Sequence, residues 1–479
     1  MRRYFTNTLL ILQQQHYKPQ AFLYIYKSRF FKLRSYSSRQ QVDRTTKLIS
    51  LICSAFLIYI CISIFVAVSI PIYITTAYMN YAYIIYIIIF FATFPLHFPL
   101  LISLIIIIFT PFQYIISQIR YQKTKKILTT RPDLIIISIA WSYGKTSMKE
   151  ILKNLLSTTY HVLVVPWNIN TPLGICKYIW DHLTSTHQIL LLEMGETHVG
   201  DIKEICDIIP PSIGIITGIT EQHIASFHSI DNVISTIFEL TSYIPDTGAL
   251  YCNCESEHVT TGLRRHIPTS KTYPIYTYTR PQNVSYLPHL QGISFVYKDR
   301  TLTCPLLGLH HTTALTLACE VAENLGISRD TCQKIIQKLP HIPHRLEPIH
   351  NPYTHITVID DSYNGNLQGV MSAIDLLNNY TCQPWWHKWI LMPWLTELGH
   401  TSAGIHTQIW QFLAKSVDYV ILISSSWSAH IINWLLSAGF PEHNIFVYNT
   451  AQEAHSSLPS LLHTHDIILF QNDIPDFAE

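Results

Sequence analysis

An apolar run of β-branched residues ends in Gly144-Lys145-Thr146-Ser147, and a helical pattern follows directly, over residues 148–156. A strand, a tight turn and a helix N-terminus in this order form a phosphate-binding loop, because free backbone N–H groups and the helix dipole favour anions. In such loops a lysine reaches the β- and γ-phosphates, and a hydroxyl contacts Mg²⁺. The segment therefore predicts an α/β protein that uses a nucleoside triphosphate, although Trp141 stands where an upstream glycine is usual.

Short apolar runs alternate with amphipathic stretches from about residue 130 onward, which is typical of an α/β fold with largely parallel sheets. Strands are expected at residues 134–140, 161–165, 189–193, 213–217, 356–360, 388–392, 419–423, 444–448 and 466–470. Helices are expected at residues 148–156, 230–243, 312–324, 368–378, 403–414 and 428–438. Residues 249–305 predict a smaller β-rich insertion, and residues 340–345 predict a domain boundary.

The first quarter of the chain is far more apolar than the rest. Hydrophobic residues make up 48% of the 479 residues and charged residues 13%, and the excess lies in runs at 48–70, 81–94 and 100–119. Crossing a bilayer takes roughly 17–25 apolar residues, so these runs predict helical membrane segments within residues 47–119. Both flanks are basic, which predicts a multi-pass protein of the cell membrane with both flanks in the cytoplasm. Whether two or three runs cross stays open, and residues 1–46 are expected to lie on the cytoplasmic leaflet as a basic amphipathic segment.

The remaining composition excludes several classes of protein. A net charge of +1 gives no reason to expect a nucleic acid partner. The ten cysteines form no CxxC pair, and the 25 histidines show no HExxH spacing. This pattern indicates reduced thiols rather than a disulfide framework or a zinc site.

Three polar clusters follow predicted strands. They are Glu193-Met-Gly-Glu196, the segment from Thr217 to His223, and the segment from Asp360 to Asn366. Open α/β sheets bind their ligands beyond the carboxyl ends of the strands, so these clusters are candidates for the site. A carboxylate and an imidazole beside a phosphate loop would suit Mg²⁺, which takes few protein ligands and keeps several waters.

The order of these clusters resembles the Mur ligase family, and most closely its MurF-type members, over about residues 134–479. The segment Asn168-Ile-Asn-Thr-Pro-Leu-Gly174 is similar to the family's substrate segment, and Leu192-Glu-Met-Gly195 to its magnesium segment. Further matching segments are Gly308-Leu-His310, His344-Arg345-Leu346, Asp360-Asp-Ser-Tyr-Asn364, and Glu397-Leu-Gly-His-Thr-Ser402 with His406.

The resemblance implies a P-loop ATPase domain at residues 130–342, a Rossmann-like C-terminal domain at 343–479, and ATP-dependent amide-bond formation with ATP and Mg²⁺. The implied partners are a muramoyl-peptide precursor and D-Ala-D-Ala or a similar amine. The implied catalytic residues are Lys145, His223, Asp361 and Asn364, and the implied metal ligands are Thr146, Glu193 and His223. The implied nucleotide ligands are Ser142, Gly144, Lys145, Thr146, Ser147, His310 and Arg345, and the implied substrate ligands are Asn168, Asn170 and Thr171.

The chain departs from the family pattern at Trp141, Gly218, Ile237 and Ala314. Ile237 replaces the lysine that is carbamylated to bind a second Mg²⁺ in the family, and Glu221 or Glu239 is a possible substitute ligand. We expect no counterpart of the family's UDP-binding N-terminal domain, with the membrane segment in its place. Two alternatives therefore stay open beside a MurF-type ligase: a ligase of a lipid-linked precursor, and a catalytically decayed, membrane-tethered scaffold of cell-wall assembly. A transporter is the weakest alternative, because the membrane segment contains no ionisable pair.

Overall fold

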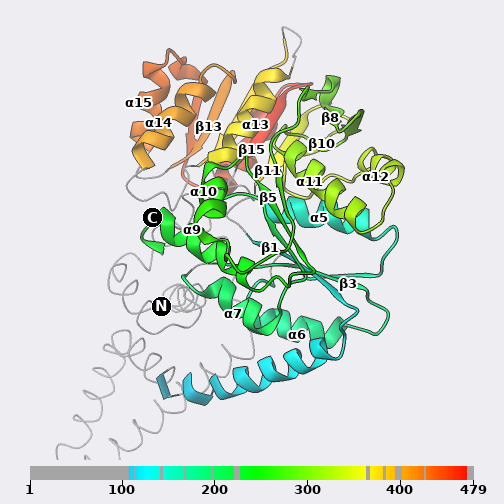
Figure 1. The fold of residues 1–479 in the computed structure, drawn as a ribbon. Helices are drawn as coiled ribbons and strands as arrows, with labels where there is room; N and C mark the ends of the chain where they lie inside the picture. Colours follow the sequence, from blue (N-terminus) through cyan, green and yellow to red (C-terminus); the bar gives the residue numbers. More distant parts are fainter. Residues whose placement is uncertain are drawn as a thin grey trace, which may run out of the picture. The chain divides into compact units, whose positions relative to one another are not determined.

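The computed structural model describes residues 107–108, 110–112, 114–140, 144–166, 169–196, 198–220, 227–362, 367–380, 385–393, 402–424 and 428–471 (Figure 1). Residues 120–475 belong to one compact unit, which contains all the elements named below.

The first half of this unit is built on a six-stranded sheet. Its strand order is β2-β3-β1-β4-β5-β6, and every neighbouring pair is parallel. The strands are β1 (Ile135–Ala140), β2 (Val162–Val164), β3 (Ile189–Glu193), β4 (Ile213–Ile216), β5 (Ala249–Asn253) and β6 (Ile275–Tyr278). A small antiparallel sheet of β7 (Ser285–Tyr286), β8 (Ile293–Tyr297) and β9 (Arg300–Cys304) follows. The expected β-rich insertion at residues 249–305 is therefore only partly correct, because β5 and β6 of that segment belong to the main sheet.

Alternate residues of β1 and β3 face two different helical layers (Figure 1). Ile136 and Leu190 pack against α6 (Pro172–His182), α7 (Asp201–Ile208) and α9 (Ile230–Phe238). Ile137 and Leu191 pack against α5 (Lys145–Leu156) and α11 (His311–Asn324). A parallel sheet buried on both faces explains why these strands are apolar throughout. The other helices of this half are η2 (Glu239–Ser242), α10 (Glu257–His266), η3 (Pro288–Leu290) and α12 (Arg329–Ile336).

The second half contains another six-stranded sheet, with the order β10-β11-β15-β12-β13-β14. Only β10 runs antiparallel to its neighbour. The strands are β10 (Glu347–His350), β11 (Thr357–Asp361), β12 (Lys388–Met392), β13 (Tyr419–Ile423), β14 (Ile445–Tyr448) and β15 (Ile467–Gln471). Helices α13 (Leu367–Asn379), α14 (Ser402–Leu413) and α15 (Ser428–Ser437) cover one face, and α16 (Ala451–Leu461) covers the other; η5 (Glu442–Asn444) precedes β14.

The predicted membrane region has to be corrected. Among the residues that the structure describes, no helix combines the length and the apolarity that a bilayer crossing requires. The segments 1–46, 48–70 and 81–94 lie outside the described residues, as does part of 100–119. The prediction of N-terminal membrane segments, a multi-pass location in the cell membrane and a bilayer partner is therefore wrong for the described part of the chain.

The physical reason is visible where the described chain leaves the last apolar run. Residues 120–129 are helical, but Tyr121, Thr124 and Leu128 are buried while charged residues alternate with them. The Tyr121 hydroxyl donates to Glu204 Oε1 at 3.0 Å, and Trp180 Nε1 donates to Thr124 Oγ1 at 2.9 Å. This amphipathic segment packs on protein, so a helix that continues into it loses the uniform apolarity of a membrane span.

Candidate active site

The loop between β1 and α5 lies where the first sheet changes its direction of strand order, because β1 lies between β3 and β4. Such a switch point is where open α/β sheets bind ligands. Gly144, directly before α5, has a φ of 76°, a left-handed conformation that glycine adopts without steric cost. The first turn of α5 contains Lys145, Thr146 and Ser147, and its backbone N–H groups have no partner within the helix. This helix N-terminus therefore suits an anion such as a phosphate.

Two lysines of α5 contact two carboxylates, one in the last residue of β3 and one just after that strand. Lys145 Nζ lies 3.5 Å from Glu196 Oε2, and Lys149 Nζ lies 2.8 Å from Glu193 Oε1. The Lys145 side chain is 24% exposed, whereas that of Lys149 is 1% exposed. Lys145 is therefore the cation that a dissolved ligand can reach, and Lys149 is an internal counter-ion.

The predicted metal ligands provide the donors that Mg²⁺ prefers. Glu193 is the last residue of β3 and is in register with Ile139 near the end of β1. Its carboxylate is buried, and Thr146 lies in the first turn of the neighbouring helix α5. A carboxylate and a hydroxyl beside a phosphate loop fit the hard-oxygen chemistry of Mg²⁺. The third predicted ligand, His223, lies outside the described residues.

A cavity of about 490 Å³ extends from this loop to the C-terminal sheet. A volume of this size lies in the usual range for small-molecule sites, about 300–1,000 Å³. Gly144 and Ser147 line it on the loop side, and Asp361 lines it from the end of β11. Arg280, His310 and Arg345 also line it. The arginines and the helix N-terminus favour an anionic ligand with several charges.

Arg345 and Asp361 are linked to each other within this cavity. Burial lowers the pKa of the Arg345 guanidinium, and the carboxylates of Asp361 and Glu193 oppose that shift. Asp361 is itself buried, and its Oδ1 accepts the Leu346 backbone N–H at 3.1 Å. The hydrogen bond from Leu346 thus fixes Asp361 to the segment that carries Arg345. The Arg345 guanidinium interacts with two carboxylates, those of Asp361 and Glu193.

His310 and its neighbour His311 form a neutral pair at the cavity wall. Their ring centroids are 4.0 Å apart, and within the described part of the chain His310 Nδ1 and both ring nitrogens of His311 are buried without a hydrogen-bond partner. Burial lowers the pKa of His310 to about 4, with Arg280 and Arg345 contributing, and burial also takes the pKa of His311 well below its usual value. His310 lines the cavity, so its ring can offer a neutral donor or acceptor to a bound base.

Residues that the sequence analysis missed complete this wall. Arg280 lies 2.5 Å from Glu255 Oε1, and Thr313 Oγ1 donates to Glu255 Oε2 at 2.8 Å. Glu255 and Arg280 each follow a strand of the first sheet, β5 and β6. Their position just after strand ends was the available signal, and it was the same signal that selected Glu193.

The predicted substrate segment adjoins the carboxylates. The Gly195 backbone N–H donates to the Asn170 carbonyl at 3.4 Å, and a Cβ at Gly195 would lie 2.8 Å from Asn170 Cγ. Thr171 is the residue before α6, whose first helical residue is Pro172. The structure therefore brings Asn170 close to the segment between Glu193 and Glu196.

The departures from the family pattern have different structural settings. Ile237 is fully buried in the apolar core of α9, and Ala314 packs within α11. Glu239 is a candidate substitute for the second metal ligand, and its Oε2 accepts a hydrogen bond from the Lys203 backbone N–H at 2.7 Å. Gly218 follows β4. The remaining predicted positions Trp141, Ser142, Asn168, Glu221, His223, Asn364 and Glu397 lie outside the described residues. His406 belongs to α14, but its side chain also lies outside what the structure describes.

Two family models match the chain. The Mur ligase middle domain matches residues 139–322, and the Mur ligase glutamate ligase domain matches residues 344–471. A relative from Mycobacterium tuberculosis, named UDP-N-acetylmuramoyl-tripeptide--D-alanyl-D-alanine ligase, is 26% identical over 299 residues, which are 60% of this chain and 58% of the relative. A ligase of the same name from Escherichia coli is 23% identical over 317 residues, 64% of this chain and 68% of that protein. The chain thus matches about three-fifths of the length of the first of these relatives.

Solved structures agree at the level of the fold. MurF from Acinetobacter baumannii superimposes with a TM-score of 0.63 at 21% identity, over 74% of this chain and 78% of that one. MurF ligase from Thermotoga maritima, in complex with ADP, superimposes with a TM-score of 0.62 at 19% identity, over 75% of this chain and 81% of that one. The two six-stranded sheets, the loop at Gly144 and the two matching domain models lead to one conclusion. The chain belongs to the Mur ligase family and carries its middle domain and its glutamate ligase domain.

Proposed function

We propose that this protein is an ATP-dependent ligase that joins the carboxylate of a muramoyl-tripeptide to the amine of D-Ala-D-Ala. The observation that carries the proposal is the common cavity of about 490 Å³, which joins the helix N-terminus at Gly144 to Arg345 and Asp361. The names of the relatives support the choice of substrates. They also favour a ligase of a UDP-linked precursor over a lipid-linked one and over a decayed scaffold.

The residues of the first sheet would bind the triphosphate. The N–H groups after Gly144 and the Lys145 ammonium would neutralise charge on the phosphates, and Thr146, Glu193 and His223 would hold Mg²⁺. Bound Mg²⁺ would stabilise charge on the phosphate oxygens. Lys145 would exchange its contact with Glu196 for a phosphate, because that contact is long, at 3.5 Å, and partly exposed.

The chemistry would take two steps. The substrate carboxylate attacks the γ-phosphorus, the bond to ADP breaks, and an acyl phosphate forms. The amine then attacks the acyl carbon, the C–O bond to phosphate breaks, and the amine proton leaves to a base or to water. Arg345 would bind phosphate oxygens, and Asp361 would fix the Arg345 segment through the Leu346 N–H. Asn170 and Thr171, with Asn168, would orient the peptide, and Asn364 would act beside Asp361.

The test is phosphate release by the purified full chain with MgATP, UDP-MurNAc-tripeptide and D-Ala-D-Ala. We expect release that requires both substrates and falls by at least about 100-fold in Lys145→Ala, because one transition-state charge contact is lost. Lys153→Ala is the matched control, since Lys153 is on the same helix but 48% exposed and paired with Glu150. Equal activity of Lys145→Ala and the control would refute the proposed role, and no turnover by the unaltered chain would refute the substrates.

A further inference from the structure

The C-terminal sheet has a cluster of two histidines and a buried aspartate at the beginnings of its central strands β15 and β12, whereas the cavity lies at the carboxyl end of β11. Asp466 directly precedes β15 and His387 directly precedes β12, and the register pairs Lys388 with Ile467. Asp361 ends β11, whose first residue, Thr357, is in register with the same Ile467. Four residues of strand correspond to about 13 Å. The cluster is therefore separate from the proposed active site.

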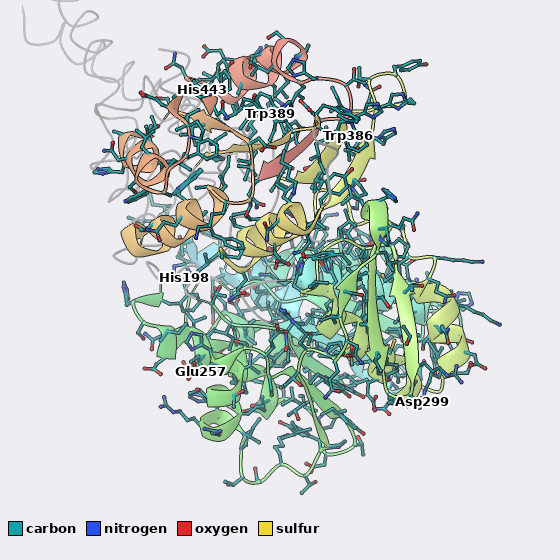
Figure 2. All side chains as sticks on the ribbon, turned by 90° about the horizontal axis from the view of Figure 1, so that it is seen from above. His198, Glu257, Asp299, Trp386, Trp389 and His443 are labelled. Carbon is teal, nitrogen blue, oxygen red and sulfur yellow. The ribbon has the colours of Figure 1, made fainter. Side chains whose placement is uncertain are left out.

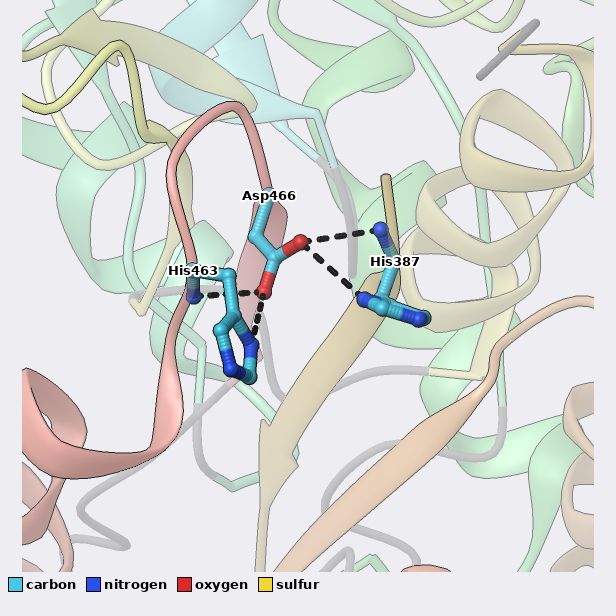
Figure 3. A group of neighbouring side chains, drawn as sticks. All are labelled: His387, His463 and Asp466. Carbon is cyan, nitrogen blue, oxygen red and sulfur yellow. Dashed lines mark hydrogen bonds and ion pairs between the residues drawn. The ribbon is translucent and has the colours of Figure 1, made fainter. Parts of the chain in front are cut away.

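The Asp466 carboxylate lies between the two imidazole rings (Figure 3). His387 Nδ1 lies 3.4 Å from Asp466 Oδ1, and His463 Nδ1 lies 3.8 Å from Asp466 Oδ2. One ligand atom from each residue lies within 4.8 Å of the other two. Ligands at about 2.0–2.1 Å in a tetrahedron around zinc are about 3.3 Å apart. The two nitrogen–oxygen distances exceed such an edge by up to about 0.5 Å and end on different oxygens of the Asp466 carboxylate, so a bound ion would require a small adjustment of the exposed His463 ring.

Three hydrogen bonds hold the Asp466 carboxylate in a fixed position. Its side chain has no exposed surface, and it accepts the backbone N–H groups of His387 and His463, each at 2.9 Å. Trp389 Nε1 donates a third bond, also at 2.9 Å. A carboxylate has about four lone-pair sites, so an acceptor site remains after these three bonds. Hydrogen bonds that fix a ligand in this way raise metal affinity at known sites.

The two imidazoles supply the remaining donors. His387 Nδ1 is buried and has no hydrogen-bond partner among the described residues, which is costly for a polar atom. The His463 ring, in contrast, is 74% exposed and leaves a path from solvent. A metal would give the buried nitrogen its missing partner, and a water would occupy the open position.

An aromatic stack supports the turn that carries His463. His465 has a φ of 73°, and its ring lies between His355, at 4.8 Å, and Trp386, at 4.9 Å. Trp386 and Trp389, on either side of His387 in sequence, are both labelled at the C-terminal sheet in Figure 2. The stack fixes the turn next to the start of β12, so little ordering is left for a metal to impose.

We propose that His387, His463 and Asp466 bind a divalent transition metal ion of the zinc class. Two imidazole nitrogens and one carboxylate oxygen suit Zn²⁺ or Co²⁺, whereas Mg²⁺ prefers oxygen ligands alone. The ion links the turn before β15 to the start of β12.

The test is equilibrium dialysis of the full, untagged chain against Zn²⁺, with the visible absorption of bound Co²⁺ as a second readout. We expect one equivalent at this site, and at least about a 10-fold loss of affinity in His463→Ala and in His387→Ala. His463→Ala is the main variant, because its exposed ring contributes little to packing. Asp466→Asn is only supplementary, since it disturbs three hydrogen bonds and endangers folding.

His430→Ala serves as the matched control, because His430 is an exposed histidine of α15 in the same half of the unit and outside the cluster. Unchanged binding in this control, with loss in His463→Ala, supports the site. Equal binding by the unaltered chain, His463→Ala and His387→Ala overturns it, and so does the absence of any bound Zn²⁺. Binding is measured without ATP or peptide substrates, so the result is independent of the proposed ligase activity.

Discussion

Lys149 Nζ and Glu193 Oε1 form an ion pair of 2.8 Å inside the protein, with side chains that are 1% and 5% exposed. Lys149 also donates to the Val165 carbonyl at 3.1 Å. The pair joins the helix that follows the phosphate loop to the last residue of β3. The carboxylate proposed to bind Mg²⁺ is therefore positioned by a residue of α5 that a dissolved ligand cannot reach.

We predict that Lys149→Met destabilises the protein by about 3–5 kcal/mol, because it removes the ion-pair partner of the buried Glu193 carboxylate. The measurement is the free energy of unfolding in urea. The double variant with Glu193→Gln should lose less than the sum of the single changes, since the neutral amide needs no cation. Lys153→Met, at an exposed position of the same helix, should change stability by less than about 0.5 kcal/mol. A loss in Lys149→Met no larger than this control would contradict the account.

Arg345→Ala should weaken ATP binding by at least about 10-fold, because it removes a buried cation from the cavity wall. Arg345→Lys should restore little of this, since an ammonium cannot reproduce the two-pronged geometry of a guanidinium. Titration calorimetry with ATP measures both. Arg265→Ala is the control, as its side chain is 62% exposed and paired with Asp231 on the surface. Wild-type affinity in Arg345→Ala would remove this residue from the nucleotide site.

The sequence predicted the sheets better than the helices. The nine predicted strands all occur with ends within one residue, because buried parallel strands are nearly uninterrupted apolar runs. Helices α6, α7, α10, α12 and α16, which have 8 to 11 residues, were missed. Periodicity alone identifies short helices poorly.

The site was predictable only in part. Glu193 and Asp361 end strands and Lys145 opens a helix, which sequence position reveals, whereas His310 and Arg345 were predicted from the family resemblance. The partners of these residues depend on tertiary structure: Glu196 with Lys145, Arg280 with Glu255, and His311 with His310. The assigned role of each residue, and the domain limits at 342 and 343, stay predictions. The membrane prediction is contradicted among the described residues, where no helix could span a bilayer, and the described chain after the last apolar run, residues 120–129, packs on protein as an amphipathic helix.

Gly308→Ala should destabilise the protein by about 2–3 kcal/mol, because Gly308 has a φ of 93° and a Cβ there would lie 2.6 Å from Leu346 Cδ1 and 2.7 Å from His310 Cε1. Gly326→Ala is a close control: its φ is 87°, but a Cβ would have no atom within 4 Å. The control measures the conformational cost alone, about 1 kcal/mol. The free energies of unfolding of both variants, measured by chemical denaturation, separate the cost of the close contacts from the cost of the backbone conformation. Equal losses of stability in the two variants would mean that the Leu346 side chain moves away without cost.

The buried histidines make stability depend on pH in a definite direction. The pKa of His310 is about 4 in the folded protein, against about 6.5 for a free histidine. Between these values the unfolded chain binds a proton that the folded protein refuses, so stability falls as the pH decreases from 6.5 towards 4. The loss from His310 is at most about 3 kcal/mol, and His311 adds to it in the same direction. Urea unfolding at pH 7.5 and pH 5 should therefore show a smaller drop for His310→Gln than for the unaltered chain, whereas His430→Gln, at an exposed position, should keep the full drop. An equal drop in His310→Gln would mean that this imidazole takes up its proton in the folded state as readily as in the unfolded one.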